Sequence, residues 1–169
     1  MDNITNFFYE VGTLRKIARS HRQTLLTDDL SDNIASHSFR TTVIGHQLAI
    51  MENADTAKVI LMCLYHDVGE TRTGDLNWIH KKYVSKKNVP QEFNQYWEEY
   101  EERKSLEAKI AKDADLLDQI LLLNEYVWQG NKEAVIWLKS GEQEKALTTL
   151  SAKKLAKEIN ATRPSSWWY

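Results

Sequence analysis

The chain has 169 residues, of which 42% are hydrophobic and 27% are charged, and this size and composition predict one globular domain that buries a core of its own. The formal net charge is −2, which excludes the bulk basic surface that holds a nucleic-acid backbone. We therefore expect no nucleic-acid partner, and we expect any bound anion to be held by a few placed groups.

The same sequence argues against secretion and against a membrane. The N-terminal stretch MDNITNFFYE lacks the cationic segment of a secretory signal. The longest apolar run, VILMCLY at residues 59–65, is far too short to span a bilayer. Cys63 is the only cysteine, so an intramolecular disulfide is excluded. These features predict a soluble protein of a reducing compartment, the cytoplasm.

The periodicity in the first half of the chain is helical. Apolar residues in segment 4–17 recur with the spacing of one helix face. Residues 21–34 break this pattern and predict a loop. A second helix is expected from about Ser36. A third begins at Asp55, a good N-cap, and is apolar nearly all round to Tyr65, which predicts the central, buried helix.

A long helical pattern begins after Pro90 and is expected to break once, near Ser105, before it ends at Gly130. Two or three further helices fill residues 131–162. The chain contains no repeat, no low-complexity segment and no linker. The sequence therefore predicts one all-α domain over residues 1–169.

The segment LYHDVGETRTGDL, residues 64–76, leads from the apolar third helix directly into polar residues. Neighbouring residues inside a helix point about 100° apart, but at a helix end His66 and Asp67 can turn to one side. A buried Asp is costly unless it is paired, hydrogen-bonded or bound to a metal. A divalent cation would remove that cost, and imidazole with carboxylate suits Mn, Fe, Co, Ni or Zn better than calcium.

Further ligands for such a cation are available elsewhere in the chain. His37 lies near the start of the second helix, in ASHSFR, where it can face the third helix. The stretch AKDADLLDQI places Asp113, Asp115 and Asp118 inside an otherwise apolar helix. Core packing alone does not explain these acids, so each of the three is a candidate for the fourth ligand.

The order His, His-Asp and Asp, all on helices, resembles the HD-domain metal-dependent phosphohydrolases. The segments VGTLRKIARS, ASH, LYHDVGETRTGDL and AKDADLLD are similar to the 5'-deoxynucleotidase branch over about residues 7–130. A bare HD dipeptide is a weak motif, but HD-x-x-E with a following GD, an upstream His and a downstream K-x-A-D is specific. The resemblance implies a compact HD-domain helical bundle with a central buried helix. Beyond it, residues 131–169 are expected to form C-terminal helices and an aromatic tail.

The resemblance also implies functional residues, by position. It implies four ligands for a divalent transition metal (Mn, Co, Fe, Ni or Zn, with Mg as a further candidate), namely His37, His66, Asp67 and Asp115. Glu70 matches the catalytic acidic residue, Asp75 the substrate-contacting aspartate, and Arg19 the arginine that holds phosphate. A small nucleotide substrate and a homodimer are further implications of the resemblance.

The sequence departs from the family in two segments, one directly after Arg19 and one directly before His37. Ser20, His21 and Arg22 follow Arg19 where the family has a T-G-W-like stretch, and residues 32–36 replace its usual E-S-V approach to the histidine. These segments help to shape the substrate pocket. The chemistry is therefore better supported than the substrate.

The residues favour phosphoester hydrolysis by metal-activated water, without a covalent intermediate. Glu70 could orient or deprotonate the water, or protonate the leaving oxygen. Arg19 offers a planar fork to phosphate oxygens, whereas Asp75 suits a sugar hydroxyl or the orientation of Glu70. This predicts removal of the 5'-phosphate from (deoxy)ribonucleoside monophosphates.

Two alternatives stay open at this point. The first is another small HD hydrolase that acts on an alarmone, a nucleoside triphosphate or another phosphomonoester. The second is a non-catalytic HD-fold module that binds a nucleotide. Phosphate release separates the enzymes from the binding module, and product analysis separates the two enzymes.

Overall fold

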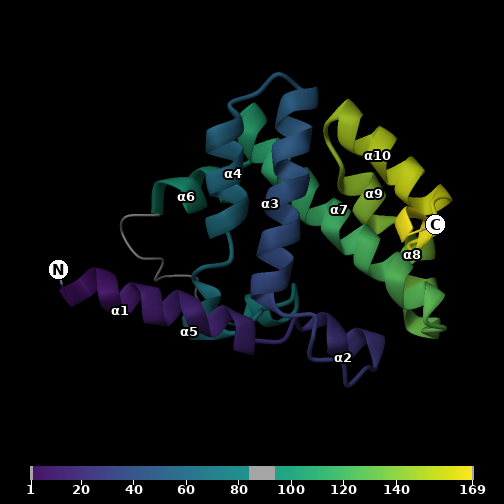
Figure 1. The fold of residues 1–169 in the computed structure, drawn as a ribbon, viewed down its shortest axis with the longest axis horizontal. Coiled ribbons are helices and arrows are strands. Elements are labelled where there is room, and N and C mark those ends of the chain that lie inside the picture. The colour runs from purple at the N-terminus through teal and green to yellow at the C-terminus, as the bar shows by residue number, and fades with distance from the viewer. Residues whose placement is uncertain (1, 84–93, 169) are drawn as a thin grey trace.

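The computed structural model describes residues 2–83 and 94–168 (Figure 1). Its helices are α1 (Asp2–Val11), η1 (Gly12–Lys16), α2 (His21–Leu25), α3 (Ile34–Met51), α4 (Thr56–Tyr65), α5 (Glu70–Thr73), η2 (His80–Lys82), α6 (Asn94–Glu102), α7 (Leu106–Trp128), α8 (Lys132–Ser140), α9 (Glu142–Ala146), α10 (Leu150–Ala161) and η4 (Ser166–Trp168). The described residues contain no β-strand, only an isolated bridge between Ala18 and Asn33. The prediction of an all-α fold is confirmed.

Helix α7 is the centre of the bundle. It crosses the paired helices α3 and α4 at one end, and helices α8, α9 and α10 pack against it at the other (Figure 1). Its buried side chains, among them Ile110, Leu117 and Ile120, join those of α3 and α4 in the largest core cluster. The sequence had placed the central helix at residues 55–65. That assignment was wrong, because α4 leaves Leu64 40% exposed while α7 is buried over most of its length.

Helix α7 begins and ends where the sequence predicts. The side chain of Ser105 caps its N-terminus by accepting a hydrogen bond from the Ala108 N–H at 3.2 Å. Gly130 follows its last turn with a φ of +87°, a conformation that glycine adopts without strain. The predicted start of the preceding helix, just after Pro90, lies outside the described residues.

The prediction of a loop over residues 21–34 was wrong in part. Residues His21–Leu25 form the short helix α2, and α3 begins at Ile34, two residues before the expected start. A five-residue helix is too short to show a helical period in the sequence. Its stability comes from tertiary contacts, because Leu25 is 1% exposed and its carbonyl accepts a hydrogen bond from the Asn131 side chain at 2.7 Å.

Close contact between α3 and α4 brings two of the predicted site residues together. A Cβ atom at Gly45 of α3 would lie 2.5 Å from Cys63 Sγ and 3.2 Å from Val59 Cγ1 of α4. Only glycine lets the two helices approach so closely. His37 lies two turns before Gly45, and His66 follows the last turn of α4, so this contact fixes the distance between the two histidines.

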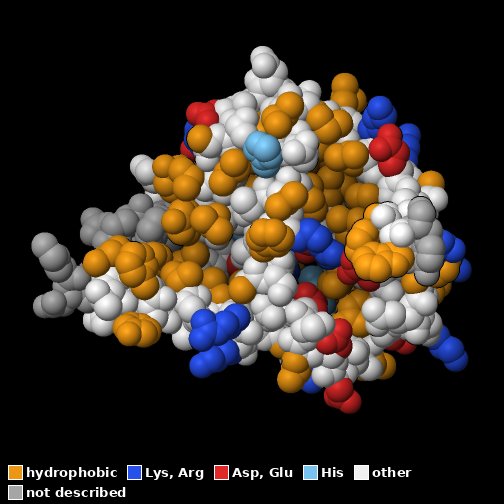
Figure 2. All heavy atoms as spheres, viewed as in Figure 1, with side chains coloured by type: hydrophobic (Ala, Val, Ile, Leu, Met, Phe, Trp, Pro, Cys, Tyr) orange, Lys and Arg blue, Asp and Glu red, His pale blue; other side chains and the backbone are white. Residues whose placement is uncertain are grey.

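An apolar groove lies between α1, α3 and α4. Its cavity volume is about 400 Å³, and its lining includes Phe8, Phe39 and Leu64. Figure 2 shows hydrophobic side chains gathered over these three helices. None of the helices in the described part of the chain combines the length and the apolar character needed to cross a membrane.

Candidate metal centre

Four of the predicted site residues come together where α3, α4 and α7 meet. His37 lies in the first turn of α3, His66 caps the C-terminus of α4, Asp67 follows it, and Asp115 lies in the middle of α7. One ligand atom each from His37, His66 and Asp115 lie within 4.8 Å of one another. Asp67 Oδ2 lies 3.3 Å from His66 Nε2 and 3.5 Å from His37 Nε2.

The hydrogen bonds on the far sides of the two imidazoles determine which nitrogen faces this centre with a lone pair. The Nδ1–H of His66 donates to the Cys63 carbonyl at 2.8 Å, and that of His37 donates to Asp118 Oδ2 at 2.7 Å. In the neutral rings, both Nε2 atoms are therefore acceptors. They face each other at 3.2 Å.

Two lone pairs at this distance repel each other, and the carboxylate oxygens beside them also only accept. Asp115 Oδ1 lies 3.4 Å from His37 Nε2. A divalent cation satisfies such a set of converging acceptors. Imidazole nitrogens with carboxylate oxygens form a ligand set suited to Mn, Fe, Co, Ni or Zn, so the residues present fit a transition-metal ion.

The protein holds the Asp115 carboxylate in a defined orientation. Its Oδ2 accepts hydrogen bonds from the Lys112 ammonium at 2.6 Å and from the Tyr100 hydroxyl at 3.0 Å, which leaves Oδ1 facing His37. Burial alone would raise the pKa of Asp115, but Lys112, the two histidines and Arg19 outweigh burial and hold that pKa well below its ordinary value. The carboxylate is therefore ionised and available to a cation.

Arg19 is 7% exposed and lies between two carboxylates. Its Nη1 donates to Asp67 Oδ2 at 3.0 Å, and its Nε lies 3.4 Å from Asp75 Oδ2. The Ser20 N–H also donates to Asp75 Oδ2, at 2.5 Å. The GD aspartate thus contacts the arginine segment, and Arg19 in turn links it to the ligand cluster.

Glu70 opens the short helix α5 directly after the His-Asp pair, and its N–H donates to the Asp67 carbonyl at 3.0 Å. Its Oε2 is buried and has no hydrogen-bond partner among the described residues. Burial, together with the negative charges of Asp67 and Asp75, raises the pKa of Glu70 to about 10. The structure therefore places the Glu70 carboxyl group in a buried, negatively charged environment directly after Asp67.

The three acids of AKDADLLDQI have three different environments. Asp115 reaches the cluster. Asp118 contacts His37 only at Nδ1, the nitrogen that points away from the cluster. Asp113 is fully buried and accepts hydrogen bonds from the backbone and side chains of Thr148 and Thr149, so it anchors the start of α10.

Sequence reasoning missed three residues that support the cluster: Tyr100 and Lys112, which hold Asp115, and Arg40, which holds Asp118. Tyr100 combines a hydrogen bond to Asp115 with a ring contact to His66, the ring centroids being 5.1 Å apart. Lys112 precedes Asp115 by three residues, a spacing that signals a helical ion pair. Arg40 follows His37 by three residues on the same helix, α3.

Three comparisons with known proteins show what the chain is similar to. The sequence model of the HD domain family matches residues 11–89 and 82–160. The chain is 30% identical over 150 residues to a 5'-deoxynucleotidase of Dictyostelium discoideum, covering 75% of this chain and 78% of that protein. It is 26% identical over 147 residues to a 5'-deoxynucleotidase of Danio rerio, covering 75% and 70%. The crystal structure of a Pyrococcus horikoshii protein aligns with a TM-score of 0.81 at 26% identity, covering 93% of this chain and 98% of that one.

Proposed function

Because this chain belongs to the HD domain family, we propose that it is a metal-dependent phosphohydrolase that removes the 5'-phosphate of (deoxy)ribonucleoside monophosphates. The observation that carries this proposal is the convergence of two imidazole lone pairs and two carboxylates beside a buried arginine. The names of the Dictyostelium and zebrafish relatives support the nucleotide substrate.

Family membership implies a divalent metal cofactor, and we propose that four residues hold it, namely His37, His66, Asp67 and Asp115. When bound, such an ion supplies the Lewis acidity that phosphoester hydrolysis by water requires. The structure favours Mn, Co, Fe, Ni or Zn through its mixed nitrogen and oxygen ligand atoms, and Mg is a further candidate.

We propose that Arg19 holds the substrate phosphate. Nη1 and Nε of its guanidinium are engaged by Asp67 and Asp75, while Nη2 has no hydrogen bond with any residue that the structure describes. A planar cation held in this way can bind a non-bridging phosphate oxygen with little loss of side-chain entropy.

Asp75 and Glu70 complete the proposed site. Asp75 uses Oδ2 for Ser20 and Arg19, so we propose that it orients Arg19 and offers Oδ1 to a sugar hydroxyl. Glu70 starts α5 shortly after the proposed ligands His66 and Asp67, and its buried Oε2 has no hydrogen-bond partner within residues 2–83 and 94–168. We propose that this carboxyl group acts on the attacking water or on the leaving 5'-oxygen.

Phosphate release from a panel of deoxy- and ribonucleoside 5'-monophosphates tests this function. The protein is stripped with a chelator and reloaded with Mn²⁺, Co²⁺, Zn²⁺ or Mg²⁺. Release should depend on the metal and vanish in Asp67→Ala. It should survive in Asp28→Asn, because the Asp28 side chain is fully solvent-exposed and its ion pair is with Arg22.

Other outcomes favour the alternatives. Pyrophosphate or tripolyphosphate from a nucleoside triphosphate or an alarmone would indicate a different HD hydrolase. Nucleotide binding without turnover under any metal would indicate a binding module. Either result would replace the 5'-nucleotidase proposal while leaving the metal site intact.

We infer that residues 1–169 act as one HD domain in the cytoplasm. Helix α7 supports a single domain, because it contacts α3, α4 and α6 as well as α8, α9 and α10. The single cysteine, Cys63, is buried and unpaired, which agrees with a reducing compartment.

We also propose a homodimer. It is supported by the groove between α1, α3 and α4, where Phe8 is 66% and Phe39 72% exposed, and by α1, which packs mainly against η1. Light scattering after size exclusion should give a dimer mass for the wild type and a monomer mass for Phe39→Asp. Trp128→Asp, at an exposed position on α7, should remain a dimer. A monomeric wild type would contradict the proposal.

A further inference from the structure

The two candidate histidine ligands are held by different acceptors. His66 donates its Nδ1–H to a neutral backbone carbonyl, whereas His37 donates to the carboxylate of Asp118 at 2.7 Å. Asp118 is 4% exposed and lies on α7 one turn after Asp115. An anionic acceptor gives a stronger hydrogen bond than a neutral one and makes the opposite ring nitrogen a better electron-pair donor.

Asp118 is itself held by Arg40, which lies on α3 one turn after His37. The Arg40 Nε donates to Asp118 Oδ1, and its Nη2 donates to the Asp118 carbonyl at 3.3 Å. Its Nη1 donates to Glu125 at 2.6 Å. A single guanidinium therefore joins α3 to two positions of α7, two turns apart.

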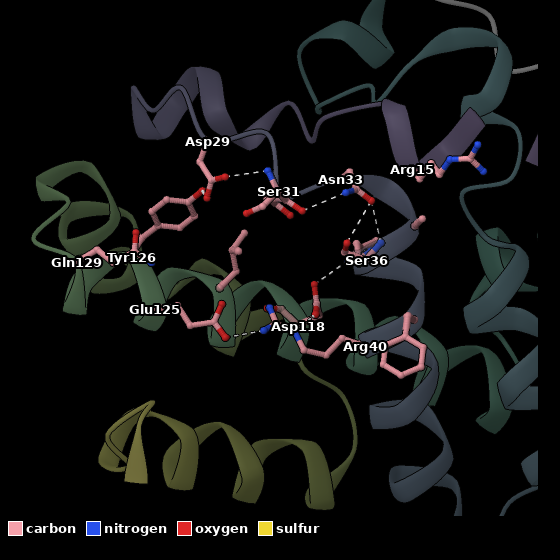
Figure 3. Close-up of a pocket in the computed structure, with 15 residues that line it drawn as sticks. Arg15, Asp29, Ser31, Asn33, Ser36, Arg40, Asp118, Glu125, Tyr126 and Gln129 are labelled. Carbon is pink, nitrogen blue, oxygen red and sulfur yellow. Dashed lines mark hydrogen bonds and ion pairs between the residues drawn. The ribbon is translucent and has the colours of Figure 1, made fainter. Parts of the chain in front are cut away.

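The arrangement forms one wall of an open pocket with a volume of about 660 Å³ (Figure 3). In that view Arg40 reaches toward both Asp118 and Glu125, and Tyr126 and Asp29 lie on the opposite side of the pocket. Both carboxylate oxygens of Asp118 accept a hydrogen bond. Oδ2 accepts from His37 Nδ1, and Oδ1 accepts from Arg40 Nε.

We propose that Asp118 and Arg40 are positioning residues of the metal centre. Asp118 holds His37 in the tautomer and ring orientation that present Nε2 to the ion, and Arg40 holds Asp118 in place. This inference rests on the metal-binding part of the proposed function and is independent of the substrate.

A second buried aspartate on the same helix provides a matched control. Asp113 is as buried as Asp118, but its hydrogen bonds go to Thr148 and Thr149 at the start of α10. Its replacement removes a buried carboxylate from α7 without touching a ligand. Loss of fold stability and loss of metal affinity can therefore be separated.

The experiment measures the Kd for Co²⁺ by competition with a chromophoric chelator. The visible spectrum of bound Co²⁺ and the Tm of the metal-free protein are recorded for the same samples. We expect Asp118→Ala to raise the Kd by about 10–100-fold and to alter the spectrum. Asp118→Asn should lose less affinity, because its amide oxygen still accepts from the Nδ1–H of His37. Arg40→Gln should also lose less Co²⁺ affinity than Asp118→Ala.

Asp113→Asn should lower the Tm and leave the Kd unchanged. The inference is overturned if Asp118→Ala binds Co²⁺ within twofold of the wild type, or if Asp113→Asn weakens Co²⁺ binding as much as Asp118→Ala does. Asp118→Asn keeps the side-chain volume, so the comparison survives if the alanine variant folds poorly. Co²⁺ binding is measured without substrate, so its result does not depend on the proposed hydrolysis. A protein that binds Co²⁺ but releases no phosphate would contradict the proposed function, and the roles of Asp118 and Arg40 would still be tested.

Discussion

At the scale of single residues, the chemistry of the site depends on which atoms of each side chain are already engaged. Asp115 offers Oδ1 to the centre because Lys112 and Tyr100 engage Oδ2. His37 offers Nε2 because Asp118 engages Nδ1. The site is therefore an arrangement of acceptor atoms directed inward by donors and acceptors behind them.

The role of Arg19 can be tested by a change that keeps its charge. Arg19→Lys replaces a planar fork, held by Asp67 and Asp75, with a single ammonium that cannot serve both carboxylates and a phosphate oxygen. We expect kcat/KM for a nucleoside monophosphate to fall about 10²-fold, roughly 2.7 kcal/mol of transition-state stabilisation. Steady-state phosphate release measures the effect. Arg15→Lys, at an exposed position four residues earlier, is the control, and equal losses in the two variants would refute the assignment.

Asp32 gives a prediction for the pH dependence of stability. Burial raises its pKa from an ordinary 3.8 to about 6, although Arg19 opposes the rise. Compared with the unfolded chain, the folded protein therefore favours the neutral form of the Asp32 carboxyl group. The associated stability is fully present below pH 3.8 and is lost as the pH rises through 6. Asp32→Asn keeps the neutral form at every pH, so its Tm should exceed that of the wild type by about 2–4 °C at pH 8, the equivalent of roughly 1 kcal/mol.

The same comparison at pH 4 supplies the control. There the folded wild type already carries a neutral Asp32, so the difference in Tm between the two proteins should shrink toward zero. Differential scanning calorimetry in matched buffers measures both values. A constant difference at pH 4 and pH 8 would show that the substitution acts through packing, and not through ionisation.

The sequence predicted which residue types form the site better than it predicted which side chains contact one another. The family resemblance assigned His37, His66, Asp67 and Asp115 as the expected ligands by position. Residue type and helix position alone left Asp113, Asp115 and Asp118 as equal candidates, and burial does not separate them, since Asp113 and Asp118 are as buried as a ligand would be. Only the neighbours of each acid, supplied by distant helices, distinguish an anchor from a ligand.

At the scale of elements, the close contact of α3 with α4 determines the spacing of the histidines. Gly45→Ala would place a methyl group 2.5 Å from Cys63 Sγ, so the two helices must move apart. We expect a loss of about 1–3 kcal/mol in the free energy of unfolding, measured by urea denaturation, and a weaker Kd for Co²⁺. The double variant with Cys63→Ala removes the nearest atom and should recover part of both losses. If the effects of Gly45→Ala and Cys63→Ala on stability and on the Kd simply add in the double variant, the proposed role of the Gly45–Cys63 contact is contradicted.

Element boundaries were predictable where the chain carries its own capping signal. Ser105 and Asp55 begin α7 and α4 because their side chains accept hydrogen bonds from backbone N–H groups of the first turn. Helix α2 has no side-chain cap and depends on partners far away in the sequence. The apolar run of α4 was read as the molecular centre, yet Leu64 lines the exposed groove. Apolar periodicity predicts that one face of a helix is apolar, but it does not predict which other element packs against that face.

At the scale of the whole molecule, the ligand cluster joins segments that lie far apart in the sequence. Its residues come from α3, from the end of α4 and from α7, the helices that also build the largest core cluster. Figure 2 shows charged and histidine side chains inside a hollow between α3 and α7. A ligand that bridges these helices therefore couples to unfolding of the entire bundle.

Metal binding should accordingly stabilise the whole fold, because the unfolded chain does not hold together ligands from three separate segments, of which His37 and His66 are 29 residues apart. At a free Mn²⁺ or Co²⁺ concentration of about 100 times the Kd, the gain is roughly 2.7 kcal/mol, equivalent to a rise in Tm of about 5–10 °C over the chelated protein. Asp115→Asn should lose most of this rise, while Asp28→Asn should keep it. Equal rises in the wild type and in Asp115→Asn would mean that the ion binds elsewhere, for example to exposed surface acids, and would remove α7 from the site. A rise confined to proteins with all four ligands would instead tie the stability of the bundle to the centre where its three main helices meet.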